Sequence, residues 1–218
     1  LRCLVGSEMC IRDRNNPIED IDYPKIDSKV PFVLSTNEID KIILQASLTK
    51  FGARNQTMIE VMYSCGLRVS EVIEMKISNI FFDESLIKVM GKGKKERFVP
   101  LSGIAKKLLY NYIECERKES KFDKQSVDIV FLNNRGGKLS RIMVYNIIND
   151  AALAAEINSK ISPHTLRHSF ATHLIENGAD IISIQKMMGH ENIVTTEKYL
   201  NVNKKHLVET VIKYHPRK

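Results

Sequence analysis

Hydrophobic residues recur every three or four positions along most of the chain, which is the spacing that gives an α-helix one buried face. The first such stretch opens at Ser35, and Glu38 three residues later completes the pattern of a capping box. Its apolar face comprises Ile39, Ile42, Ile43 and Ala46. A second helix is predicted around residues 58–62. It should end at Cys65-Gly66, because glycine is typical of the position just after a helix.

The pattern changes after a short helix predicted over Val69–Met75. Three β-prone runs follow, at Ile80–Phe82, Leu86–Met90 and Arg97–Val99, and short polar or glycine-rich segments separate them. Runs of this length and spacing predict a three-stranded antiparallel meander. Helical spacing then returns at about 103–117, 141–155, 164–177, 180–188, 195–200 and 204–214, with a charged loop expected over 116–128. The fold class is therefore mainly α with one small antiparallel sheet (α+β).

The N-terminal part does not share this organisation. Residues 1–14 match nothing that follows and are interpreted as an extraneous or unrelated leader. Residues 15–34 are polar, carry three prolines and lack helical spacing, so they are predicted to form an extended interdomain linker. Residues 35–218, including a C-terminal tail helix, are predicted to form one domain.

Composition narrows the possible partners. The 218 residues are 43% hydrophobic, enough for a core, and the formal net charge of +7 favours a polyanion such as nucleic acid. The four cysteines form no CxxC pair, which disfavours a zinc knuckle and suits a reducing cytoplasm. Cys65, within an apolar run, is expected to be buried. No apolar run approaches the roughly 20 residues of a membrane span, so no membrane association is predicted.

Several residues could bind an anion, although each has an ordinary alternative. Arg68 lies at a helix start, where the helix dipole disfavours a cation unless an anion is near, and Glu71 one turn later could hold its guanidinium. His164 and Arg167 are three residues apart and so share a helix face. His168 makes a His-x-x-x-His pair with His164, but a zinc site would need a third ligand, and no metal is predicted.

Two further segments complete the candidate chemistry. The turn Gly91-Lys92-Gly93 lies between two strands, so it is not a nucleotide-binding loop. It is read as a hairpin tip that is either a solvated basic turn or a means of placing a lysine in a DNA groove, and its cations are Lys92, Lys94, Lys95 and Arg97. His190 ends a helix, and Tyr199 lies nine residues later in a helical run where a tyrosine is ordinarily half-buried core. Together, arginines, histidines, a lysine and a tyrosine suit metal-free attack on a phosphodiester.

Five segments, in this order, carry a resemblance to a known family: 66–71 (GLRVSE), 91–101 (GKGKKERFVPL), 162–174 (SPHTLRHSFATHL), 177–180 (NGAD) and 188–190 (MGH). The chain resembles the catalytic domain of the tyrosine recombinase (integrase) family, and within it the Xer subgroup. The resemblance implies the fold of the DNA breaking-rejoining enzymes and a reaction through a 3′-phosphotyrosyl intermediate, without metal, ATP or another cofactor.

The resemblance also implies a role for each residue. Arg68 and Arg167 would bind the scissile phosphate, His164 and His190 would hydrogen-bond to it, Lys92 would protonate the leaving 5′-oxygen, and Tyr199 would be the nucleophile. Glu71 and His168 would support this set, while Lys94, Lys95 and Arg97 would contact DNA. Family members usually begin with a helical core-binding domain of about a hundred residues, which is expected to be missing here.

The implied partners are a double-stranded DNA core site, a paralogous recombinase with which the chain would form a homo- or hetero-tetramer, and a cell-division DNA translocase. The enzyme would act in the cytoplasm, on the bacterial nucleoid, in chromosome dimer resolution. Alternatives are a phage or mobile-element integrase or invertase, or a DNA-binding fragment without cleavage activity. The tail over 202–214 would pack on a neighbouring protomer or, alternatively, fold back on its own domain.

Overall fold

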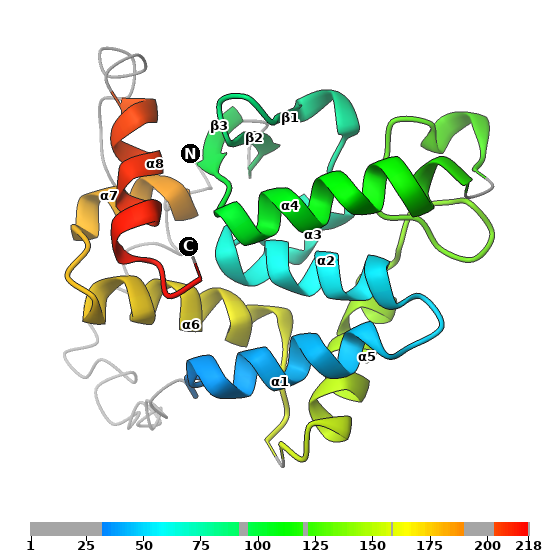
Figure 1. Cartoon of the computed structure of the whole chain (residues 1–218), viewed down its shortest axis with the longest axis horizontal. Coiled ribbons are helices and arrows are strands. Elements are labelled where there is room, and N and C mark those ends of the chain that lie inside the picture. The colour runs from blue at the N-terminus through cyan, green and yellow to red at the C-terminus, as the bar shows by residue number, and fades with distance from the viewer. Residues whose placement is uncertain (1–31, 92–95, 120–121, 158, 190–202, 218) are drawn as a thin grey trace, which may run out of the picture. The chain divides into compact units, whose positions relative to one another are not determined.

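The helices and strands follow the predicted order in the part of the chain that the structure describes. This computed structural model describes residues 32–91, 96–119, 122–157, 159–189 and 203–217 (Figure 1). The α-helices are α1 (Thr36–Ser47), α2 (Gly52–Ser64), α3 (Val69–Ile73), α4 (Gly103–Asn111), α5 (Arg141–Ala154), α6 (Pro163–Glu176), α7 (Ile181–Met188) and α8 (Asn203–Tyr214). The strands are β1 (Ile80–Phe81), β2 (Leu86–Met90) and β3 (Glu96–Pro100).

Short polar side chains fix where these helices begin. The Ser35 hydroxyl accepts a hydrogen bond from the Glu38 amide, and the Glu38 carboxylate accepts one from the Ser35 amide, so the predicted capping box is confirmed. Ser102, Ser140 and Ser162 cap α4, α5 and α6 in the same way, and Asp180 caps α7. Each cap satisfies backbone N–H groups that a helix start otherwise leaves unpaired.

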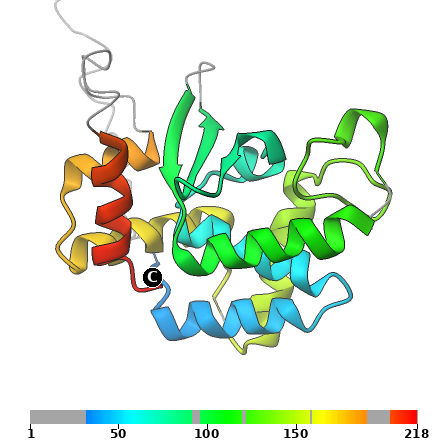
Figure 2. The ribbon, with the colours of Figure 1, turned by 45° about the horizontal axis from the view of Figure 1, so that its top comes forward.

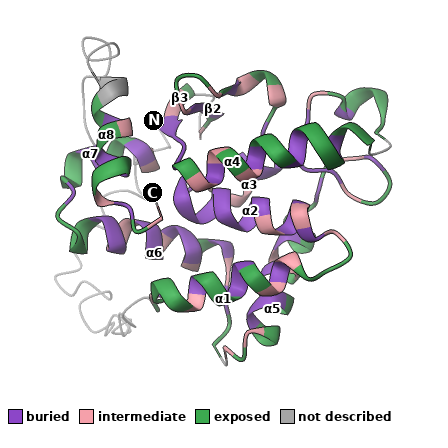
Figure 3. Ribbon diagram, in the orientation of Figure 1, coloured by how far each residue is buried: buried purple, intermediate pink, exposed green. Residues whose placement is uncertain are grey.

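Helix α2 forms the centre of the core. Most of its residues are buried, and α1, α4 and α6 pack around it (Figure 3). Met58, Ile59, Val61 and Met62 are fully buried, as is expected of a helix that is covered on every side. Cys65 follows the helix and is 1% exposed, which confirms its prediction as a buried apolar residue.

The predicted meander is confirmed, with β1, β2 and β3 joined in that order by antiparallel pairing (Figure 2). Val89 of β2 lies opposite Arg97 of β3, and Ile87 lies opposite Val99. Because side chains alternate between the two faces of a strand, Arg97 shares a face with the buried Val99. This register turns Arg97 toward the protein interior.

The boundary between the helix that begins at Gly103 and the loop after it differs from the sequence prediction. The helix that begins at Gly103 continues beyond α4 as a π-helical segment, Tyr112–Arg117, and helical backbone reaches residue 119, where a loop was expected from residue 116. The cause is Arg117, which is 3% exposed and donates hydrogen bonds to the carbonyl oxygens of Ser126, Val127 and Ile129. The helix predicted over 195–200 lies outside the described residues. Within them, no helix has the length and apolar character needed to cross a membrane.

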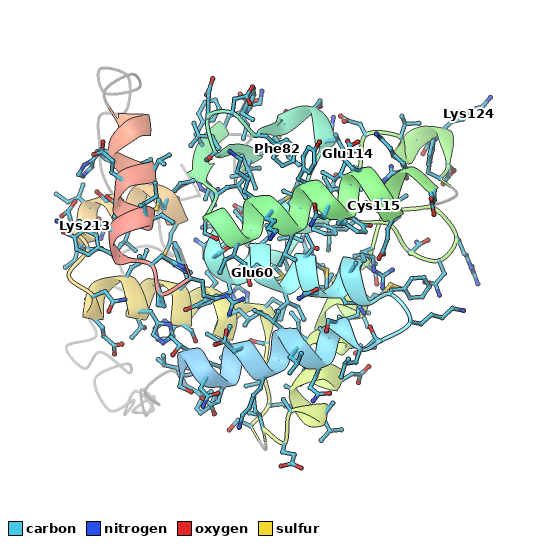
Figure 4. All side chains as sticks on the ribbon, in the orientation of Figure 1. Glu60, Phe82, Glu114, Cys115, Lys124 and Lys213 are labelled. Carbon is cyan, nitrogen blue, oxygen red and sulfur yellow. The ribbon has the colours of Figure 1, made fainter. Side chains whose placement is uncertain are left out.

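The C-terminal tail folds back on its own domain, which was the alternative to packing on a neighbouring protomer. Helix α8 packs against β3 and α7. The residues after it are anchored by Arg217, which pairs with Asp40 and, at 2.8 Å, with the fully buried carboxylate of Glu60, labelled in Figure 4. The tail therefore closes over the ends of α1 and α2 within one chain.

His215 is a second fully buried group of this anchor. It is 0% exposed and lies against the rings of Tyr63 and Phe170, with ring centroids 5.0 and 5.6 Å away. Its Nε2 has no hydrogen-bond partner among the residues that the structure describes, while its Nδ1 lies 3.1 Å from the Arg217 amide nitrogen. Burial lowers the pKa of His215 to about 4, because a charged imidazolium would lose its hydration there.

We expect this histidine to make the fold acid-sensitive. The folded pKa of about 4 lies below the ordinary value near 6.5, so its contribution is complete above pH 6.5 and is lost as the pH falls toward 4. Over that window the free energy of unfolding should fall by roughly 3 kcal/mol. His215→Asn keeps an acceptor for the Arg217 amide but cannot ionise, so urea unfolding at pH 7.5 and pH 5 should show a smaller pH dependence than in the wild type.

The comparison between variants isolates His215 from its titratable neighbours. Glu60, whose pKa burial raises to about 7, is present in both proteins, so its own titration cancels in the comparison. The charge of His173 acts on His215 and is part of the effect that is measured. His206→Asn, at an exposed position of α8, is the matched control and should keep the wild-type pH dependence. An unchanged pH dependence in His215→Asn would contradict the prediction.

Candidate functional site

The turn between α2 and α3 places Arg68. Gly66 has a φ of +58°, and a Cβ at this position would lie 2.4 Å from the ring of Phe170 in α6. Both constraints require glycine. The chain reverses here, and Arg68 becomes the N-cap residue of α3 with its side chain 31% exposed. The conformation of Gly66 thus places this guanidinium beside Glu71 and the end of α7, where its Nη2 donates to the Gly189 carbonyl.

Glu71 is the carboxylate around which the site is built. It lies one turn into α3, its side chain is 2% exposed, and its Oε2 accepts a hydrogen bond from the Arg68 amide at 2.8 Å. Its Oε1 accepts one from Nη1 of Arg68 at 3.0 Å, which is the contact expected from their spacing. Burial acts to raise the pKa of this carboxyl, but the hydrogen bonds and charge of Arg97 and the hydrogen bonds of Arg68 outweigh it and lower the pKa.

Arg167 approaches the same carboxylate from α6. Its Nη1 donates to the Gly66 carbonyl, 101 residues away in the chain, at 2.5 Å and lies 3.9 Å from Oε2 of Glu71. Its Nη2 donates to the carbonyl of Met188, and the side chain is 7% exposed. Burial, together with the neighbouring charges of Arg68 and Arg97, lowers the pKa of Arg167 to about 10. Two arginines from distant segments therefore meet beside one buried acid.

Arg97 also lies in this cluster, although the sequence suggested a DNA contact at the hairpin tip. Its Nη1 and Nη2 donate to the two oxygens of Glu71 at 2.7 and 2.9 Å, and its Nε donates to the Met187 carbonyl at 2.8 Å. The side chain is 13% exposed. The cue in the sequence was the alternation of β3, because Arg97 is two residues from the apolar Val99.

The C-terminal end of α7 supplies the remaining acceptors. The carbonyls of Met187, Met188 and Gly189 receive hydrogen bonds from Arg97, Arg167 and Arg68 respectively. Carbonyl groups at a helix C-terminus lack partners within the helix and carry partial negative charge, which favours cations. Gly189 ends the helix in the left-handed conformation, with φ +63°. Sequence patterns did not indicate these backbone contacts.

The other predicted residues divide into two groups. His164 is exposed in the first turn of α6, where it shares a face with Arg167, and His168 is partly buried one turn later. His173 is a packed histidine, with its Nδ1 2.8 Å from the Tyr63 hydroxyl. Lys92, Lys94, Lys95, His190 and Tyr199 lie outside the described residues. Within them, no group of three or more potential metal-ligating side chains occurs.

The cluster is suited to binding an anion. Arg68, Arg97 and Arg167 share ion pairs with Glu71, which gives these four side chains a formal charge of +2. Guanidinium groups can donate several hydrogen bonds in a plane, which matches the oxygens of a phosphate. Arg68 is the most exposed of the three guanidiniums, so it is the one most open to an incoming phosphate.

Comparisons with known proteins agree with this geometry. Residues 33–206 match the model of the phage integrase family. The chain is 43% identical over 204 residues to a tyrosine recombinase XerD of Oceanobacillus iheyensis, covering 93% of this chain and 68% of that protein. It is 41% identical over 203 residues to one of Staphylococcus saprophyticus, with the same two shares.

Solved structures give the same result. The crystal structure of XerA recombinase superposes with a TM-score of 0.69 at 34% identity, covering 87% of this chain and 67% of that one. The pre-cleavage complex of XerH site-specific recombinase bound to difH substrate superposes with a TM-score of 0.65 at 27% identity, covering 75% and 48%. The integrase of mycobacterium phage Brujita superposes with a TM-score of 0.71 at 25% identity, covering 94% and 65%.

Glu71→Gln should destabilise the domain strongly. The change removes the negative charge between three guanidiniums and turns one buried acceptor into a donor, and breaking a buried ion pair on one side costs about 3–5 kcal/mol. Urea unfolding at pH 7 measures the loss. Glu74→Gln is the matched control, because Glu74 pairs with Lys138 on the exposed surface, and it should cost under about 1 kcal/mol. Equal losses in the two variants would show that Glu71 does not organise the arginines.

Proposed function

The chain belongs to the phage integrase family of tyrosine recombinases, and we propose that it cleaves and rejoins DNA at a specific core site with Arg68 and Arg167 binding the scissile phosphate. The observation that carries this proposal is the meeting of the two arginines beside the buried Glu71. Their guanidiniums neutralise the charge that grows on the non-bridging oxygens in the transition state. Removal of one such donor costs an enzyme roughly 10²–10³ in rate.

The reaction consists of two successive transesterifications at one phosphorus atom. The phenol oxygen of Tyr199 attacks the phosphorus, a 3′-phosphotyrosyl bond forms, and the bond to the 5′-oxygen breaks. Lys92 donates a proton to that 5′-oxygen, while His164 and His190 hydrogen-bond to the phosphate, with His168 in support. A 5′-hydroxyl of the partner strand then attacks the phosphotyrosine and releases Tyr199. Because the ester keeps the energy of the broken bond, ATP is not required. The two guanidiniums neutralise the charge that a metal ion would otherwise neutralise.

Lys94 and Lys95 at the hairpin tip are proposed to contact the DNA backbone near the cleaved bond. They lie next to Lys92 in the chain, and lysine contacts to phosphates supply affinity without reading sequence. Arg97 is not included among these contacts, because its three guanidinium nitrogens donate within the protein.

The biological role that the comparisons favour is chromosome dimer resolution in the cytoplasm, on the nucleoid. Identity of 39–43% to XerD proteins supports it, as does the similarity to XerH bound to its difH substrate. We propose that the chain acts in a tetramer with a paralogous recombinase on such a site, together with a cell-division DNA translocase. We further propose that the chain consists of an unrelated leader (1–14), a linker (15–34) and the catalytic domain (35–218).

Two alternative functions would give different experimental results. A phage or mobile-element integrase would share the chemistry but recombine two unlike sites; the phage integrase neighbour is 25% identical, below the XerD relatives. A DNA-binding fragment without cleavage activity would bind the core site and never become covalently attached to it. The chain spans 68% of the length of the first XerD relative, so the grip of a whole recombinase on DNA is not assumed.

Covalent capture tests the proposed nucleophile. A duplex with a dif-type core site and a nick beside the cleavage point loses the short strand after attack, which traps the phosphotyrosyl adduct. The wild-type chain should give a protein–DNA band on a denaturing gel, and Tyr199→Phe should give none, because only the phenol oxygen can form the ester. Tyr110→Phe, at an exposed tyrosine of α4, is the matched control and should behave as the wild type. DNA binding without an adduct in the wild type would favour the non-cleaving alternative.

The proton donor can be tested by changing the leaving group. Lys92→Ala should slow adduct formation by roughly 10²–10⁴-fold, the usual contribution of a general acid. A 5′-bridging phosphorothiolate substrate releases a thiolate, which needs no proton, so the variant should then cleave at nearly the wild-type rate. Lys88→Ala, a lysine of β2 that pairs with Glu96, should be insensitive to the change of substrate. Persistent slow cleavage of the thiolate substrate by Lys92→Ala would remove this role from Lys92.

A further inference from the structure

The contacts of Arg97 with Glu71 and the Met187 carbonyl are not explained by a direct contact with DNA. Arg97 lies on β3, five residues after Lys92 in the sequence, and its guanidinium binds Glu71 and the end of α7. We propose that Arg97 is a positioning residue for DNA cleavage, which fixes Glu71 and the end of α7 and thereby sets the spacing of Arg68 and Arg167. This inference rests on the proposed recombinase function.

The first support is the way in which Arg97 holds Glu71. Its two terminal nitrogens bind both carboxylate oxygens, so the plane of the carboxylate follows the plane of the guanidinium. Oε1 then meets Nη1 of Arg68 at 3.0 Å, and Oε2 lies 3.9 Å from Nη1 of Arg167. Among the described residues, Arg68 and Arg97 are the side chains that donate hydrogen bonds to Glu71, so without Arg97 the carboxylate would be free to rotate away from Arg167.

The second support is the bond from Nε of Arg97 to the Met187 carbonyl. The next two carbonyls of the chain bind Arg167 and Arg68, so one displacement at the end of α7 moves an acceptor of both phosphate-binding arginines. A methyl group at Gly189 would lie 3.2 Å from Cδ of Arg97, which shows how closely this turn is fitted to the side chain. His190 follows this turn directly in the sequence.

Arg97 therefore connects the three segments that carry the proposed chemistry. Strand β3 continues from the hairpin of Lys92, α3 carries Arg68 and Glu71, and α7 leads to His190. Lysine cannot replace it, because a single ammonium group cannot bind two carboxylate oxygens and a carbonyl in one plane. This requirement separates a positioning role from a role that needs only positive charge.

The test compares Arg97→Lys and Arg97→Ala with the wild-type chain on the nicked core-site duplex. At saturating protein, the single-turnover rate of adduct formation should fall roughly 10²-fold in both variants, as expected when reacting groups shift by about 1 Å. The Kd for an intact duplex, and its dependence on salt concentration, should stay as in the wild type. If Arg97 instead contacted a phosphate, Arg97→Ala would weaken binding and reduce the salt slope by about one, and Arg97→Lys would largely restore both.

A charge-neutral substrate distinguishes positioning of the arginines from general damage to the fold. Replacing one non-bridging oxygen of the scissile phosphate by methyl removes the charge that Arg68 and Arg167 neutralise. The rate ratio of wild type to Arg97→Lys should then shrink by at least tenfold, whereas a variant that is only destabilised would keep its ratio. An unchanged ratio on this substrate would overturn the inference.

Controls separate the failure of this inference from failure of the proposed function. Lys88→Ala, the neighbouring cation on β2, should keep the wild-type cleavage rate on both substrates. If the wild type forms no adduct, the recombinase function fails and this inference fails with it. If the wild type and Arg97→Lys form adduct equally fast, only the role of Arg97 is rejected. Should Arg97→Ala unfold, Arg97→Lys, which keeps the positive charge, decides the question.

Discussion

The buried carboxylate of Glu71 is the constraint on which the candidate site depends. Three guanidiniums within a few ångströms would repel one another strongly in a region that water hardly reaches. Glu71 lies between them, and the carbonyls at the ends of α2 and α7 satisfy the N–H groups that it cannot reach. The positive charge that remains is held in place before any substrate arrives. Such preorganisation is what makes an electrostatic site effective in catalysis.

The surrounding fold brings these partners together. Helix α2, most of whose residues are buried, fixes the origin of the Gly66 turn, and Phe170 of α6 packs on that turn so closely that only glycine fits. The same helix α6 carries Arg167, so the contact that positions the turn also positions the second arginine. The packing of the core and the placement of the arginines are therefore not independent, and a change in the core at Phe170 would also displace Arg68 and Arg167.

The tail illustrates the same coupling at the other end of the domain. Its anchor places His215 and Arg217 against Tyr63 and Glu60, two residues of α2. A buried neutral histidine and a buried ion pair are costly to form, and neither is needed simply to cover apolar surface. Their presence makes docking of the tail specific to one position on the domain.

The sequence alone determined the order of the helices, the three-stranded meander and most helix starts, because caps, turns and hydrophobic spacing act over a few residues. The motif segments also singled out Arg68, Glu71 and Arg167, which the structure brings together, and the spacing of Arg68 and Glu71 predicted their contact. The sequence alone did not determine the role of Arg97, the carbonyl acceptors of α7 or the docking of the tail. Each of these depends on atoms that lie far apart in the chain and meet only when α3, β3, α6 and α7 converge. Rules that act over a few residues cannot predict such contacts. Whether a charged side chain lies at the surface or in the interior depends on partners that are distant in the sequence.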